Sequence, residues 1–175
     1  AKKALTPISV VFDSYGAGDH QKAQVYFVNQ GTDPLADVTV EARIYDLGGK
    51  LVDQVTGHVD SSLPHSSTEV FALDRYDEVG SAFFVRLNAK DSAGKELVEN
   101  TYWQSATDDL PDDGSTSIVD AMMVKQSQWA DLSALDQLPA IGLSGSLIEM
   151  AEDESLRNFE VTLRNDTDSV AFFVR

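Results

Sequence analysis

The sequence contains no cysteine, so it forms no disulfide, no thiolate zinc site and no cysteine nucleophile. It also lacks any apolar run approaching the ~20 residues that a membrane-spanning helix needs. No apolar stretch follows Lys2 and Lys3, so the start does not match a secretory signal peptide. The chain begins with alanine instead of methionine, and we expect it to be a segment excised from a longer protein.

Positive charge is scarce. Thirteen Lys and Arg face 29 Asp and Glu, for a formal net charge of −16. Binding to nucleic acid requires a cationic surface that releases counterions, and anionic membranes have the same requirement. We therefore expect no nucleic-acid partner and no membrane partner. Such an acidic surface suits a salty or extracellular setting, and we expect an extracytoplasmic or secreted location.

Helical periodicity is missing from the first hundred residues, where short strands alternate with turn residues. The clearest strand places Val38, Val40, Ala42 and Ile44 on one face, with polar or aromatic residues between them. Glycines, prolines and aspartates divide the other apolar segments at regular spacing. These features predict an all-β fold, an immunoglobulin-like β-sandwich of about seven strands. The expected strands lie near residues 10–12, 22–29, 38–45, 51–59, 69–73, 82–89 and 96–103.

Two segments, 46–50 and 91–95, share the pattern Asp-x-x-Gly-Lys. Each lies between two expected strands, and its glycine is able to adopt a positive φ angle. The repetition predicts two similar hairpin turns.

Composition changes after residue 105. We divide the chain into a sandwich at 1–105, a linker with a short helical segment at 106–139, and the first strands of a second sandwich at 140–175. Leucines at spacing three predict a helical turn or two near residues 131–135. A turn at 165–168 precedes a further strand that we expect to begin at Val170. Few strands follow Pro139, so we expect a truncated second β-sandwich unit that promotes self-association.

Several short motifs occur in a specific order along the chain. They are residues 29–30, 44–46, 91–98, 100–103, 126–135, 161–165 and 171–175. In this order and spacing they resemble the C-terminal immunoglobulin-like region of family 2 glycoside hydrolases. The resemblance is to the exo-β-D-glucosaminidase type, which is related to β-mannosidases.

The resemblance implies a parent enzyme with a catalytic (β/α)₈ barrel followed by two immunoglobulin-like domains. Residues 1–105 would form the first of these two domains, and residues from about 140 would open the second. The catalytic glutamates of such enzymes lie on the barrel, so no catalytic residue is assigned to this chain. The barrel of the parent enzyme is then the expected intramolecular partner.

The sequence gives weak support for metal binding or phosphate binding. The acidic run Asp108–Asp113 has the composition of a solvated linker, with calcium binding as the alternative, although it does not follow the EF-hand pattern. His20, His58 and His65 have no metal-ligand spacing. No glycine-rich phosphate loop is present. We therefore expect no catalytic residue, no metal ligand and no cofactor.

Tyr102, Trp103 and Trp129 are the candidate contact residues, toward either a sugar or a neighbouring domain. Aromatic faces stack on pyranose rings, but on a strand Tyr102 and Trp103 point to opposite sides. Packing within the protein is therefore the favoured interpretation.

Two functional hypotheses follow. The first is a non-catalytic accessory module that braces the catalytic barrel of an enzyme acting on β-linked glucosamine or mannose glycans. The second is a carbohydrate-binding module that tethers the enzyme to polysaccharide. A cell-surface adhesion repeat is a third alternative, because this fold hosts many functions.

Overall fold

The computed structural model describes residues 6–14, 23–74, 76, 79–107, 109–111, 126–150 and 158–172. Within these residues the regular structure is β-strand, apart from short 3₁₀ segments. None of the helical structure there is long and apolar enough to cross a membrane. The expectation of an all-β chain is confirmed.

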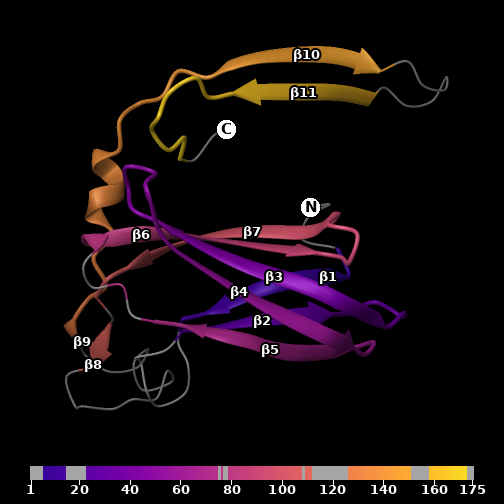
Figure 1. Cartoon of the computed structure of the whole chain (residues 1–175). Coiled ribbons are helices and arrows are strands. Elements are labelled where there is room, and N and C mark those ends of the chain that lie inside the picture. Colours follow the sequence, from indigo (N-terminus) through magenta and orange to yellow (C-terminus); the bar gives the residue numbers. More distant parts are fainter. Residues whose placement is uncertain are drawn as a thin grey trace.

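Seven strands form a two-layered sandwich (Figure 1). One layer is a three-stranded sheet in the order β1-β2-β5, and the other is a four-stranded sheet in the order β4-β3-β6-β7. All neighbouring strands in both sheets are antiparallel. The strands are β1 (Ile8–Asp13), β2 (Ala23–Asn29), β3 (Leu35–Tyr45), β4 (Leu51–Ser62), β5 (Ser66–Leu73), β6 (Ala82–Lys90) and β7 (Glu96–Ser105).

The fourth strand decides how the seven strands are divided. In constant-type immunoglobulin domains the fourth strand joins the sheet of the first, second and fifth strands. Here β4 pairs with β3 over almost its whole length, from Leu35 with Ser62 to Tyr45 with Leu51. The tight turn after β3 returns the chain directly alongside β3, so β4 becomes an edge of the four-stranded sheet.

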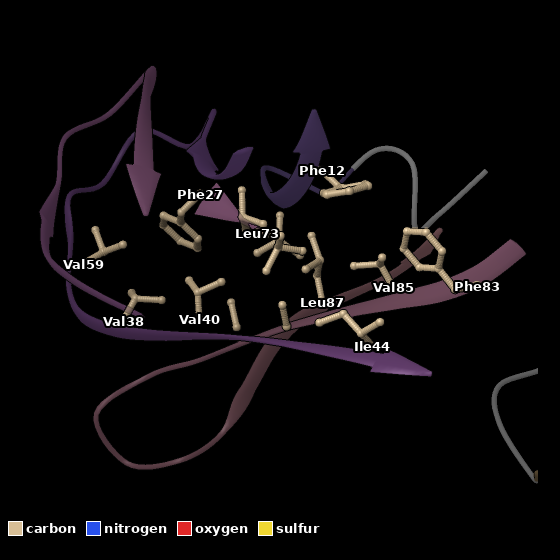
Figure 2. Close-up of a cluster of buried hydrophobic side chains, with 14 residues drawn as sticks. Phe12, Phe27, Val38, Val40, Ile44, Val59, Leu73, Phe83, Val85 and Leu87 are labelled. Atoms are coloured by element: carbon tan, nitrogen blue, oxygen red, sulfur yellow. The ribbon is translucent and has the colours of Figure 1, made fainter. Parts of the chain in front are cut away.

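The core lies between the two sheets and is apolar. Alternation along β3 turns Val38, Val40, Ala42 and Ile44 inward, as the sequence predicts, and all four are buried. Figure 2 shows these side chains meeting aromatic and aliphatic residues of the opposite sheet. The largest fully buried apolar side chains are Phe27, Ile44, Leu73, Leu87, Val10, Val25, Val38, Val40 and Val85.

The two Asp-x-x-Gly-Lys segments form matching turns, which confirms the prediction. In each turn the glycine amide donates to the aspartate carbonyl, at 3.0 Å for Gly49 and 2.9 Å for Gly94. Each lysine amide also donates to the aspartate Oδ1 at 2.9 Å. The glycines have φ angles of 84° and 79°, a left-handed conformation that residues with a Cβ rarely adopt.

Beyond the sandwich, the short strands β8 (Leu110–Pro111) and β9 (Gln126–Gln128) pair with each other. The segment in which we expected a helical turn contains a 3₁₀ helix, η3 (Ser133–Gln137). The chain then forms a hairpin of β10 (Ser144–Met150) and β11 (Asn158–Arg164). Of the acidic run at 108–113, only residues 109–111 lie within the described part of the chain.

One expected strand is wrong. Residues 170–172 are not a strand, although the sequence predicted one beginning at Val170. These residues lie against the outer face of the four-stranded sheet, where the Phe172 ring contacts aromatic side chains instead of entering a hydrogen-bonded ladder. Residues 173–175 lie outside the described residues.

Truncation of a core side chain should destabilise the sandwich strongly. Leu87 is fully buried between the sheets, so Leu87→Ala leaves a cavity and should lower the unfolding free energy by about 2–5 kcal/mol. Leu63 is 65% exposed, and Leu63→Ala should change it by less than about 0.5 kcal/mol. Urea denaturation of both variants measures the difference, and equal effects would contradict the assigned core.

Tyr76 lies between β5 and β6 and contacts the sandwich through both its hydroxyl and its ring. Its hydroxyl donates to Asp53 Oδ2 at 2.8 Å, and its ring packs edge-on against Phe83 with 5.7 Å between centroids. Burial raises the pKa of Tyr76 above its ordinary value, and the hydrogen bond to Asp53 raises it further. The folded state thus favours the protonated phenol.

This raised pKa has a consequence at alkaline pH. The stabilisation from Tyr76 is fully present below the pKa of an unfolded tyrosine, about 10, and is lost as pH rises above it. In an absorbance titration of the folded chain we expect a tyrosine ionisation step above the ordinary range, which belongs to Tyr76. Tyr76→Phe should remove this late step, and a late step that persists in this variant would contradict the assignment.

Candidate functional site

Three aromatic side chains form a row across the outer face of the four-stranded sheet. Tyr45 of β3 pairs in register with Phe84 of β6, and Phe84 pairs with Trp103 of β7. Directly paired residues on one sheet face have neighbouring side chains. We call these three residues the aromatic row.

Phe172 of the C-terminal segment covers this row. Its ring centroid lies 5.5 Å from that of Phe84 and 5.4 Å from that of Trp103, the latter in an edge-to-face arrangement at 84°. Both geometries fall within the favourable range for aromatic pairs. As a result Phe84 is only 5% exposed although it points away from the core, while Trp103 remains 42% exposed.

A cavity of about 460 Å³ lies between the row and the C-terminal segment. Its volume falls within the range of small-molecule pockets. The lining is mainly apolar, with a polar edge from Arg86 and Thr101. The lining residues are Tyr45, Gly49, Phe84, Arg86, Thr101, Trp103, Val170, Ala171 and Phe172.

The charge at this polar edge is neutralised within the sheet. Arg86 Nε donates to Glu99 Oε2 on the neighbouring strand at 3.0 Å, and Arg86 Nη2 contacts the same oxygen. This hydrogen bond raises the pKa of the Arg86 guanidinium above its ordinary value, so the group stays charged. The cavity thus combines aromatic walls with a paired cation.

Tyr102 lies on the opposite face of β7 from Trp103. Its ring packs edge-on against Phe12 of β1, with 5.7 Å between centroids. Its hydroxyl accepts a hydrogen bond from Asn100 Nδ2 at 2.8 Å and lies 3.4 Å from the carbonyl of Val10. Tyr102 therefore connects the two sheets and does not reach the cavity.

Trp129 lies next to β9 and is 70% exposed. The backbone that follows it is fixed, since the Ala130 amide donates to Asp109 Oδ1 at 2.7 Å and the Asp131 amide to Ser105 Oγ at 2.9 Å. Trp129 does not line the cavity. Of the three candidate contact residues, the structure brings only Trp103 to this site.

Among the described residues, no group of three or more His, Asp or Glu side chains is placed to hold a metal ion. His58 lies at the edge strand near Asp37 and Asp60, while His65 occupies a turn with a φ of 56°. His20 lies outside the described residues.

Sequence reasoning missed Tyr45, Phe84 and Phe172 as members of this site. A signal for Phe84 was present, because the apolar run from Ala82 to Val85 is continuous and does not alternate. A strand that is apolar at consecutive positions is covered on both faces. Nothing in the sequence indicated that Phe172 would provide the cover, since it lies 88 positions from Phe84.

Comparison with known proteins adds to this geometry. Residues 21–107, which include β2 to β7, match the family described as the Mannosidase Ig/CBM-like domain. This part of the chain is similar to a Mannosidase Ig/CBM-like domain. The resemblance to the C-terminal immunoglobulin-like region of family 2 glycoside hydrolases is therefore confirmed, together with the immunoglobulin-like fold.

The curated relatives of the domain are much longer proteins. The exo-β-D-glucosaminidase of Amycolatopsis orientalis is 26% identical over 178 residues, covering 99% of this chain and 16% of the relative. That of Arthroderma benhamiae is 25% identical over 157 residues, covering 90% of this chain and 17% of the relative. The chain thus spans about a sixth of the length of these relatives.

The solved structure of the Amycolatopsis orientalis exo-chitosanase CsxA shows the same fold. It matches with a TM-score of 0.75 at 24% identity, covering 94% of this chain and 18% of that structure. This structural match extends beyond the sandwich, because it covers 94% of the chain, whereas residues 21–107 make up only about half of it.

The two tryptophans should contribute unequally to stability. Trp103→Ala removes a ring packed beside Phe84 and Phe172, and we expect a loss of about 1–3 kcal/mol. Trp129 is 70% exposed, so Trp129→Ala should cost less than about 0.5 kcal/mol. Thermal or urea unfolding compares them, and a larger loss for Trp129→Ala would refute the ranking.

Proposed function

We propose that this chain is a non-catalytic accessory module of a family 2 glycoside hydrolase that acts on β-linked glucosamine or mannose glycans. The observation that carries the proposal is the extent of the match, 99% of this chain against 16% of an exo-β-D-glucosaminidase. A segment of that size, made of an immunoglobulin-like sandwich and a hairpin, supports a structural role. The enzyme activity then belongs to other parts of the parent protein.

The covered aromatic row supports a structural module that braces the parent enzyme, and not a surface that binds sugar. A pyranose ring stacks on an open aromatic face, but the Phe172 ring packs against Trp103 and covers Phe84. The remaining polar edge is an arginine already paired with Glu99. The aromatic row therefore serves a contact within the protein, with Phe172. The expected partner of the module as a whole is the catalytic barrel of the same parent chain.

We retain the division of the chain at 1–105, 106–139 and 140–175 as part of this proposal. The end of β7 at Ser105 and the start of β10 at Ser144 support it. Self-association through the second unit also stays a prediction. The many exposed apolar side chains of β10 and β11 favour it, and the net charge of −16 opposes it.

A carbohydrate-binding module remains the alternative function, on the basis of one observation. Trp129 exposes 70% of its surface, and a solvent-facing indole is suited to stacking on a sugar ring. In this alternative Trp129 would tether the parent enzyme to polysaccharide.

Calorimetric titration of the 175-residue chain with chitosan and mannan oligosaccharides separates the two functions. The brace predicts no saturable heat with either sugar. Saturable heat that disappears in Trp129→Ala, but not in Leu63→Ala, would establish the binding module instead. A chromogenic β-glucosaminide and a β-mannoside provide a second test, and their hydrolysis by this chain would refute the non-catalytic assignment.

A further inference from the structure

The β10–β11 hairpin has little packing of its own. Both strands are exposed along their described length, and neither packs extensively on another strand outside the hairpin. Its apolar side chains are roughly half exposed or more, namely Leu147, Ile148, Met150, Phe159, Val161 and Leu163. The hairpin therefore has no hydrophobic core of its own that would hold it on the sandwich.

The segment after β11 returns to the sandwich through an ordered turn. Asn165 Nδ2 donates to the Ser169 carbonyl at 2.8 Å, and Asn165 Oδ1 accepts from the Thr167 amide at 3.0 Å. Such local side-chain bonds hold a turn without help from distant residues. Figure 1 shows this segment reversing after β11 and ending on the side of the sandwich formed by β6 and β7.

Two contacts then hold the segment on the outer face. Phe172 lies against Phe84 and Trp103, as described above. Val170 lies over the turn that joins β3 and β4. A Cβ placed on Gly49 would lie 3.2 Å from Val170 Cγ2 and 3.5 Å from the Asp168 carbonyl oxygen. The absence of a side chain at Gly49 allows this approach.

Gly94 provides an internal comparison. It occupies the same position in the matching turn between β6 and β7, with nearly the same φ angle, 79° against 84°. A Cβ placed on Gly94 would meet no atom within 4 Å. The two turns therefore share their backbone requirement, and only the Gly49 turn also contacts the C-terminal segment.

We propose that the aromatic row and the Gly49 turn form a docking surface for residues 168–172 of this same chain, and that this joint fixes the β10–β11 unit on the sandwich. Phe172 is its anchor. The joint does not depend on which sugar the parent enzyme cleaves, so its test is independent of the test of the proposed function.

Thermolysin digestion of the 175-residue chain tests the joint, because docking of residues 168–172 should protect the bond before Val170 from cleavage. Phe172→Ala removes both aromatic contacts and should speed this cleavage about ten-fold. Gly49→Ala should also speed it, whereas Gly94→Ala, which introduces the same backbone strain, should leave the rate unchanged. Mass spectrometry of the released peptide measures each rate.

Fluorescence provides a second readout that does not depend on proteolysis. Trp129→Phe leaves Trp103 as the one tryptophan of the two in the chain. In that background Phe172→Ala should shift the Trp103 emission to longer wavelength and increase its quenching by acrylamide, and Gly94→Ala should do neither.

Two results would overturn the joint. One is cleavage of Phe172→Ala at the wild-type rate with unchanged Trp103 emission. The other is equal cleavage of Gly49→Ala and Gly94→Ala. If Phe172→Ala failed to fold, the comparison of the two glycine variants would still decide, because both substitutions lie in matching turns of the same sheet, outside the buried core.

Discussion

The structure depends on the burial of β6 on both of its faces. Phe83, Val85 and Leu87 point inward and meet the opposite sheet, while Phe84 points outward and is covered by Phe172. β6 also pairs with β3 on one side and β7 on the other. One strand thereby organises the core, the four-stranded sheet and the contact with the C-terminal segment, so the sandwich and the unit that follows it share a common support.

This arrangement is consistent with the structural role that we propose for the module. The outer face of the four-stranded sheet carries aromatic packing and a paired arginine, and among the described residues no group of three or more His, Asp or Glu side chains is placed to hold a metal ion. An immunoglobulin-like sandwich is stiff because its strands are hydrogen-bonded to their neighbours within each sheet and packed across the core. In the proposed function, such a module would keep neighbouring parts of the parent enzyme at a fixed distance and orientation.

The sequence predicted the sandwich well because its information is local. Alternation along 38–45 and the Asp-x-x-Gly-Lys turns depend only on near neighbours, and both match the structure. The position of β4 in the four-stranded sheet did not follow from the periodicity of its sequence, because β4 would bury the same face in either sheet. The strand expected at Val170 was wrong for a related reason: Phe172 packs on Phe84 and Trp103, which are distant in sequence.

The contact between Phe172 and the aromatic row is the most direct point at which to test this account. Nuclear Overhauser spectra of the 175-residue chain, with selectively labelled aromatic rings, report ring protons that lie within about 5 Å. The structure places the Phe172 ring centroid 5.4 Å from Trp103 and 5.5 Å from Phe84, so cross-peaks to both rings are expected. Their absence in a chain whose Phe12 and Tyr102 rings still show a cross-peak would contradict the docked C-terminal segment.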